Sequence, residues 1–530
     1  MQKVSPETEP QPGPNERDNE NRLRIVRLPT GTRRDGSAEE PSEPETPLPE
    51  DIVSLGLTHV RIIERFVQQH GSSVLFCAAL GGWLFYDGRH WIRSDREVYG
   101  RLVALVRAVH MECLNIEDTD LFKEAMKFLL RAESKEGIAA MMALAEKALA
   151  VGVEMFDKQQ WLVNVLNGTL DLQTGKLRPH DSADFITKLL KTSYDPVANC
   201  PVWKNFISTM LGNDNELIVF AQRLVGYSLS GQANERIIIL LVGSGKNGKS
   251  TLLDLLRILF GDADAAGFAH KVDAGALTKT KQRDTLFQLA VLRGARIVSL
   301  AEKFGTTAID IELLKELAGN EAIVARHPHG RPFTFKPEFT LWVGTNKLPA
   351  VPDDLAIFDR LRIVPCNVRF YDTEQEAVAG CGDKSRVKDV FLPDKLIEEL
   401  PGILAWAVQG CLDWKKHGLA APKAVQQATA AYQRQSNPLP DFLIENCVIE
   451  PNAKIIRDDL WEAFQHWAEE SGRALSKFEF LAGVKAQVGS PAPKRIEGML
   501  KRCWVGIRLR KPGEKIKVQQ GAASLVRRRC

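Results

Sequence analysis

Eight consecutive residues have the types and the spacing that are needed to hold a polyphosphate. They run from Gly243 to Ser250 and fit the pattern G-x-x-x-x-G-K-[ST]. In this pattern the backbone N–H groups cradle phosphates, the lysine reaches the β- and γ-phosphates, and the hydroxyl binds Mg²⁺. Lys249 and Ser250 hold those two positions, and Thr251 follows them. The other members of this predicted nucleotide site are Gly243, Ser244, Gly245, Lys246, Asn247 and Gly248.

The segments on either side are of the kind that position such a loop. Residues 236–242 form a continuous apolar run, which predicts a buried parallel strand. Residues 251–260 have a helical pattern that stops at Gly261. A strand, a glycine-rich turn and a helix N-terminus direct several N–H groups to one point. The sequence therefore predicts a site for ATP and Mg²⁺ rather than an ordinary glycine-rich loop.

Two polar residues follow later apolar runs and could complete a hydrolytic site. Glu302 ends the run 296–301, where a carboxylate could hold Mg²⁺ through water and orient the attacking water. The alternative for Glu302 is a surface or helix-capping carboxylate. Asn346 ends the run 339–345, where its amide could bond the γ-phosphate or that water. The alternative for Asn346 is a turn residue before Pro349.

An arginine beyond these runs has a different expected position. Arg360 stands just before the predicted strand 361–365, where it could cross a subunit boundary and neutralise charge on a neighbour's nucleotide. The alternative is a surface arginine that is paired with Asp359.

Composition places these residues in a multidomain globular chain. The 530 residues are 44% hydrophobic and 26% charged, with a net charge of +3, so any affinity for nucleic acid must come from local patches. The sequence contains no bilayer-spanning run and no secretory leader, and its nine cysteines form no C-x-x-C pair. We therefore expect a cytoplasmic protein with reduced thiols and no membrane partner.

Several elements are expected outside the nucleotide site. The chain should form a hairpin that turns at Asp87–Gly88, helices across 96–155, and one amphipathic helix from Trp203 to about Leu229. After about residue 425, helices precede a basic terminus with interleaved apolar residues, which predicts a β-wing packed on helices. That terminus could contact DNA or could simply be a solvated surface.

In the order and spacing of its motifs, the chain resembles the superfamily 3 helicases, specifically the helicase portion of phage and plasmid primases related to the poxvirus primase-helicase. The resemblance covers roughly residues 95–510. It includes the segments 162–172, 194–196 and 200–203, which are similar to the helicase-associated N-terminal domain, and the additional motif at 314–326. The DNA contacts that the resemblance implies are Lys315 and, at the tip of an expected hairpin in a central pore, His327, His329 and Arg331. That tip could also be a surface turn without a partner.

Three positions depart from the family pattern. Ala301 precedes Glu302, so one carboxylate must serve both the metal and the water. Gly319-Asn320-Glu321 stands where the family often has Gly-Gly-Asp. Asp359 replaces a first arginine, which makes Arg360 the better finger candidate and leaves Arg362 as the weaker one.

The resemblance implies an α/β fold: a P-loop, AAA+-like core with a parallel sheet, a mostly helical N-terminal domain and a winged-helix-like C-terminal domain. The expected limits are a disordered tail (1–50), a small β-containing segment (51–95), the helicase-associated domain (96–230), the ATPase core (231–425), the winged-helix-like DNA-binding domain (426–512) and a basic tail (513–530).

The implied function is an ATP-dependent replicative DNA helicase of a phage or mobile element, which would act in the bacterial host cytoplasm. It would form a ring, expected to be a hexamer, and translocate on single-stranded and forked DNA. The sequence offers no primase active site, so a separate primase or polymerase is a possible partner. Two alternatives stay open: an origin-binding initiator with a structural ATP site, and a P-loop kinase of another class.

Overall fold

The computed structural model describes most of the chain between residues 57 and 514. The described residues are 57–261, 267–272, 286–287, 289–300, 310–319, 321–326, 330–346, 348, 355–471, 473, 475–496, 499–511 and 514. The predicted tail 1–50 lies outside them, as does all of the predicted tail 513–530 except Glu514.

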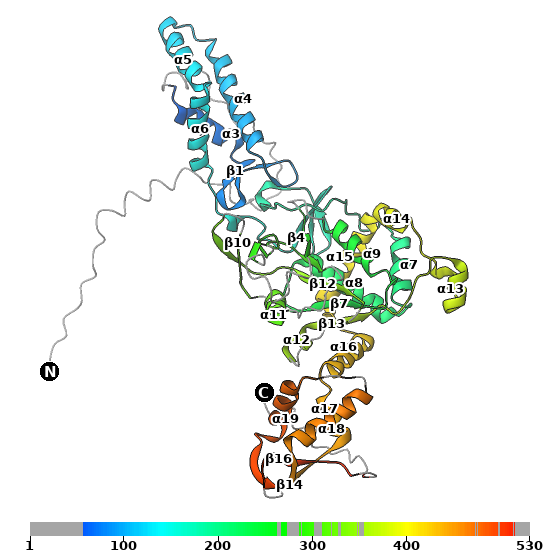
Figure 1. The fold of residues 1–530 in the computed structure, drawn as a ribbon. Coiled ribbons are helices and arrows are strands. Elements are labelled where there is room, and N and C mark those ends of the chain that lie inside the picture. The colour runs from blue at the N-terminus through cyan, green and yellow to red at the C-terminus, as the bar shows by residue number, and fades with distance from the viewer. Residues whose placement is uncertain are drawn as a thin grey trace, which may run out of the picture.

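The described N-terminal part joins a small sheet to a bundle of helices (Figure 1). The helices start at side chains that accept backbone N–H groups, namely Ser94, Asp118 and Ser134. One apolar core joins the sheet to the helices across residue 95. The elements are α3 (His59–His70), β1 (Val74–Cys77), η1 (Ala78–Leu80), β2 (Gly82–Tyr86), β3 (Trp91–Arg93), α4 (Asp95–Cys113), α5 (Thr119–Ala132) and α6 (Lys135–Ala148).

A second small sheet and two helices lead to the centre of the molecule. The predicted single helix from Trp203 to Leu229 is wrong, because the chain turns at residues 211–214. Gly212 and Asn213 have φ values of 69° and 59°, which a continuous α-helix cannot contain. Asp214 then caps the second helix. The elements are η2 (Val153–Met155), β4 (Leu162–Val165), β5 (Gly168–Asp171), β6 (Lys176–Arg178), η3 (Ser182–Asp184), α7 (Pro201–Met210) and α8 (Asn215–Ser230).

A five-stranded parallel sheet forms the centre, as the sequence predicts. The strand order is β13-β7-β12-β9-β8, so the strand before the phosphate loop lies between two neighbours. Helix α9 follows that loop directly. The elements are β7 (Ile238–Val242), α9 (Lys249–Leu259), β8 (Ala269–Val272), β9 (Ile297–Leu300), α11 (Ile311–Ala318), β10 (Ile323–Arg326), β11 (Pro332–Phe335), β12 (Thr340–Thr345), α12 (Leu355–Arg360) and β13 (Leu361–Pro365).

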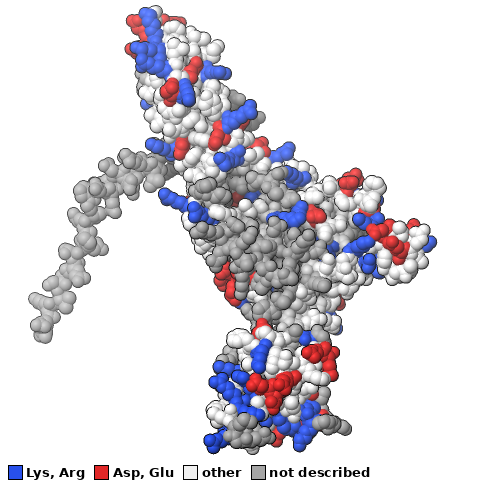
Figure 2. Space-filling model, in the orientation of Figure 1, with Lys and Arg blue, Asp and Glu red and all other residues white. Residues whose placement is uncertain are grey.

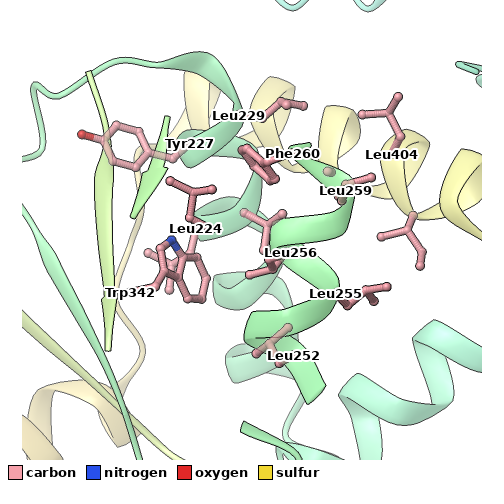
Figure 3. Close-up of a cluster of buried hydrophobic side chains, with 14 of the residues drawn as sticks. Leu224, Tyr227, Leu229, Leu252, Leu255, Leu256, Leu259, Phe260, Trp342 and Leu404 are labelled. Carbon is pink, nitrogen blue, oxygen red and sulfur yellow. The ribbon is translucent and has the colours of Figure 1, made fainter. Parts of the chain in front are cut away.

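Alternate side chains of these strands face opposite layers of helices. Ile239 and Trp342 join the core formed with α7, α8, α9 and α15, part of which is drawn in Figure 3. Ile238 and Leu341 join the core formed with α11, α12 and the β10–β11 hairpin. The sheet is therefore buried on both faces, which explains the continuous apolar runs in the sequence.

Further helices follow β13 and connect the sheet to the last domain. Helix α15 packs along α8, and α16 packs along β13. The elements are α13 (Glu374–Cys381), η5 (Lys384–Arg386), α14 (Leu392–Glu398), α15 (Leu400–His417) and α16 (Lys423–Ser436). Among the described residues, no helix is both long enough and apolar enough to cross a membrane.

The last domain packs three helices on a three-stranded antiparallel sheet of order β14-β16-β15. Phe442, Phe464, Phe480 and Trp504 form its buried core. A hairpin ends the domain, as the predicted β-wing requires, while the identity of the domain as a winged helix stays a prediction. The elements are α17 (Leu439–Asn446), β14 (Cys447–Ile456), α18 (Arg457–Glu470), α19 (Lys477–Val488), β15 (Ala492–Ile496) and β16 (Met499–Leu509).

Candidate nucleotide site

The backbone of the phosphate loop, residues 243–250, requires glycine at several positions. Gly245 and Gly248 have φ values of 98° and 83°, in the left-handed region that favours glycine. A Cβ on Gly243 would lie 2.2 Å from the carbonyl oxygen of Cys366. Helix α9 begins at Lys249, so its first N–H groups point out of the helix at the end of the loop. This geometry suits an anionic ligand.

Lys249 lies at the centre of the loop and is almost fully buried. Its Nζ donates to the carbonyl of Gly243 at 3.0 Å, to Oδ1 of Asn247 at 2.9 Å and to Oδ1 of Asn346 at 3.0 Å. The residue is 5% exposed. The ammonium is therefore fixed between the loop and the strand that ends at Asn346. The hydroxyl-bearing Ser250, which follows it, is exposed and lines the adjoining cavity.

Asn346 reaches Lys249 because two neighbouring strands end at the same level. Thr345, the last residue of β12, pairs with Val242, the last residue of β7. The residue that follows each strand therefore lies at one edge of the sheet, which we call the carboxyl edge. The sequence predicts that Asn346 stands beside the loop, and the contact with Lys249 brings the two side chains together. Its role in sensing the γ-phosphate stays a prediction.

The side chain of Asn247 links the phosphate loop to a distant segment, and the sequence did not predict this contact. Its Oδ1 accepts the N–H of Gly245 at 2.7 Å, and its Nδ2 donates to the carbonyl of Val368 at 2.7 Å. The side chain is buried, with 2% of the residue exposed. Because Val368 lies far along the chain, no local pattern could have indicated this contact.

Residues 366–372, which we call the strap, run beside the phosphate loop. Cys366 donates its N–H to the carbonyl of Val242, and Phe370 donates its N–H to the carbonyl of Lys246, both at 2.7 Å. Lys246 also forms an ion pair with Asp372, and this hydrogen bond lowers the pKa of the Asp372 carboxyl. Burial raises the pKa of the Cys366 thiol to about 12, so it stays neutral beside the loop. The strap thus fixes the loop from one side.

Glu302, the predicted catalytic and metal-binding carboxylate, lies outside the described residues. The strand before it, β9, ends at Leu300, which pairs with Val343 of β12. This register directs the chain toward the carboxyl edge, where Lys249 and Asn346 meet. The role of Glu302 stays a prediction.

Arg360 lies at the other end of the sheet, which we call the amino edge. It precedes Leu361, which pairs with Ile238 at the start of β7, whereas the phosphate loop follows the end of that strand. Its Nη1 donates to the carbonyl of Ala356 at 2.7 Å, and its Nε is buried without a hydrogen-bond partner in the part of the chain that the structure describes. Among the described residues, no ion pair joins Arg360 to Asp359. The alternative of an arginine that is neutralised by Asp359 is therefore not the arrangement seen.

The predicted DNA contacts are only partly within the described residues. Strands β10 and β11 form the expected antiparallel hairpin, with Arg326 opposite Pro332. Arg331 is exposed near its tip, whereas His327 and His329 lie outside the described residues. Lys315 lies on α11 and pairs with Glu312 at 2.9 Å, with 18% of its side chain exposed. Of these four residues, Arg331 is the one that the structure describes as exposed.

A cavity of about 960 Å³ opens beside the phosphate loop. Lys249, Ser250 and Asn346 line one part of it. Helix α7, Phe370 and Asp372 of the strap, and residues between 385 and 395 line the rest, and the sequence predicted none of these as part of a site. The volume is that of a typical small-molecule site.

Two protein-family models match separate segments of the chain, and two viral proteins are similar to it in sequence. Residues 63–212 match a family described as "D5 N terminal like", and residues 241–360 match a family of unknown function (DUF5906). The chain is 28% identical over 324 residues to "Putative helicase L207/L206" of Acanthamoeba polyphaga mimivirus and 24% identical over 348 residues to "Putative helicase 022R" of Frog virus 3 (isolate Goorha). The resemblance to the viral primase-helicases is confirmed.

These matches extend over only part of the relatives. They cover 59% and 61% of this chain, but only 33% of either viral protein. Among solved structures, the apo structure of the NrS-1 C-terminal region (305–718) is 14% identical, with a TM-score of 0.35 over 59% of this chain and 77% of that one. A structural similarity with so low a TM-score does not support any conclusion about the fold of this chain.

Proposed function

We propose that the chain is an ATP-dependent DNA helicase that acts in the replication of a phage or virus-like mobile element. The observation that carries the proposal is the contact of Lys249 with Asn346 at the phosphate loop. A lysine at the β- and γ-phosphates and a polar side chain on the neighbouring strand are the parts that such an ATPase needs. The viral helicases to which the chain is similar support the same activity.

In this proposal the residues of the carboxyl edge divide the work of hydrolysis. The phosphate loop binds ATP through its N–H groups and Lys249, and Asn346 contacts the γ-phosphate. Glu302 orients the attacking water. The residues that would hold Mg²⁺ are Ser250, whose hydroxyl lines the cavity, and Glu302; the ion would supply positive charge that stabilises the phosphates.

Arg360 would act on the ATP of a neighbouring subunit. The strand between it and the loop separates the two by roughly 15 Å within one chain, at about 3.3 Å for each residue. A buried Nε without a partner is costly, so a new acceptor would be favoured. We therefore propose a ring, with six subunits as the expected number, in which each ATP site is completed by Arg360 of the next subunit.

DNA would contact the protein at two places. The β10–β11 hairpin would present Arg331, with His327 and His329, to a single strand in the pore. In the last domain, which we propose to be a winged helix, Lys494 of β15 lies directly opposite Lys501 of β16, and neither lysine has an ion pair among the described residues. Like charges in this arrangement destabilise a hairpin, which favours a binding role. Figure 2 shows basic side chains along the margin of this domain.

Measurement of ATP turnover by the purified full-length protein, with and without single-stranded DNA, tests the proposal. We expect DNA to raise the turnover, and a forked duplex to be separated only when ATP is present. Lys249→Ala serves as the matched control for contaminating ATPases. Turnover that DNA does not change, without strand separation, would instead favour an initiator with a structural ATP site or a P-loop kinase.

A further inference from the structure

The cavity beside the phosphate loop extends well beyond the residues that would hold phosphates. Gly248 lies beside two aromatic rings of this lining, because a Cβ there would lie 2.9 Å from the ring of Phe206 and 3.6 Å from the ring of Phe370. The lining also includes Val202, Asn205 and Thr209, which lie outside the loop. At about 960 Å³, the cavity has room for a ring system besides the phosphates.

One face of helix α7 lines part of the cavity. Val202, Asn205 and Thr209 recur at intervals of three and four residues, so they lie on one helical face. Asn205 is exposed, and neither its amide nor the hydroxyl of Thr209 bonds to another residue that the structure describes. Both groups are therefore available to a ligand.

The helix that carries this face is held firmly in place. The carboxylate of Glu399 accepts the N–H groups of Val202 and Trp203 at 3.0 and 2.9 Å. Trp203 is fully buried and packs edge-on against Trp406 at 5.2 Å. A ligand on the outer face of α7 would thus meet side chains with a fixed backbone, which reduces the entropy lost on binding.

The residues that the strap contributes to the lining are also fixed. Phe370 is held by its N–H bond to Lys246, and Tyr371 exchanges backbone hydrogen bonds with residues 386 and 388 at 2.8 and 2.7 Å. Phe370 is partly exposed and lines the cavity. An aromatic ring and a helix-borne amide therefore line the same cavity, a combination that suits a planar heterocycle with polar edges.

We propose that this part of the cavity binds the nucleobase, and that the Asn205 amide selects adenine over guanine. The inference rests on the proposed function, because it assumes that the phosphate loop holds a triphosphate. An amide offers one donor and one acceptor side by side. Adenine presents the complementary pair on one edge, the N6 amino group beside the N7 ring nitrogen, whereas the same edge of guanine presents two acceptors, O6 and N7. Phe370 stacks on the base.

Competition binding with the full-length protein tests this proposal. A ribose-labelled fluorescent ATP is displaced by unlabelled ATP or GTP, and the ratio of the two dissociation constants is measured. Asn205→Ala should reduce the preference for ATP by about 5- to 100-fold, the usual value of one bidentate contact. Asn205→Asp keeps the shape but only accepts hydrogen bonds, so it should shift the preference toward GTP, whose base can turn its two neighbouring donors, N1–H and the N2 amino group, to the carboxylate.

Two further variants separate the parts of the site. Phe370→Leu should weaken ATP and GTP together, because stacking does not depend on the edge of the base. Ser208→Ala lies on the same helix, where Ser208 bonds Asn213 instead of lining the cavity, and should keep the original ratio. An unchanged ATP-to-GTP ratio in Asn205→Asp would overturn the base site while leaving the ATPase intact. If the unaltered protein binds neither triphosphate, the proposed function itself fails, and the base site with it.

Discussion

The two edges of the central sheet differ in how fully the hydrogen-bond donors of their charged side chains are paired. At the carboxyl edge, the ammonium of Lys249 bonds Gly243, Asn247 and Asn346 among the described residues of its own chain. At the amino edge, the side chain of Arg360 bonds, among the residues that the structure describes, one carbonyl of its own helix, and its buried Nε has no partner among them. The first edge is thus organised by one chain, whereas the second has unused hydrogen-bonding capacity. This difference is what a site shared between subunits requires.

The largest effect is expected at the carboxyl edge. Lys249→Ala should abolish ATP turnover, because no other side chain at the centre of the loop can reach the β- and γ-phosphates. The fold should persist, since the side chain of Lys249 contributes hydrogen bonds rather than apolar packing; circular dichroism and thermal unfolding check this. Lys246→Ala is the matched control, because that lysine pairs with Asp372, and it should retain measurable turnover. Turnover near the original rate in Lys249→Ala would refute the assignment of the loop.

At the amino edge, Arg360→Ala should lower ATP turnover by about 10³-fold, the lower range for arginine fingers. Mixing Arg360→Ala subunits with Lys249→Ala subunits should restore part of the activity, since the two defects fall on different sides of an interface. Arg362→Ala is the control: its Nη1 bonds two carbonyls of its own chain, and its turnover should change little. Mixed rings that contain both variants and recover nothing would make Arg360 a structural residue, and the contrast between the edges would fail.

The smallest effect is expected at the β10–β11 hairpin, which belongs to neither edge. Arg331→Ala should weaken binding of single-stranded DNA and make the salt dependence shallower by about one unit of slope, because one phosphate contact is lost. Binding measured across a series of salt concentrations gives the slope. Lys336→Ala, at the far end of β11, should leave the slope unchanged. Equal slopes for Arg331→Ala and the unaltered protein would move the DNA contact elsewhere, first to the C-terminal domain.

Local patterns predicted the parts of the site that one element determines. The apolar run before the loop and the helical pattern after it correspond to β7 and α9 within two residues, because burial on both faces of the sheet leaves a continuous apolar run. The expectation of one helix from Trp203 to Leu229 failed for a related reason. The amphipathic pattern continues across both helices and hides a Gly-Asn-Asp turn whose positive φ values end the first one.

Contacts between distant segments could not be predicted in this way. The amide of Asn247 fits the loop pattern as any residue would, and its partner Val368 carries no side-chain signal because it contributes a carbonyl. The walls of the cavity are similar: α7 was predicted as an amphipathic helix, but which face meets the phosphate loop depends on Glu399 and Trp406, far along the chain. Such pairings follow from tertiary packing, which a single sequence does not display.

The strap has a consequence for the order in which the protein matures. Lys246 and Asp372 are separated by 126 positions, so the ribosome finishes the phosphate loop well before the segment that holds it. At a synthesis rate of about 5–20 residues per second, Asp372 of the strap is added roughly 6–25 s after Lys246 of the loop. A nascent chain that ends before the strap would carry the complete motif but not its fixed shape. If the loop binds ATP as proposed, we expect nucleotide capture to begin only after β13 and the strap have been synthesised.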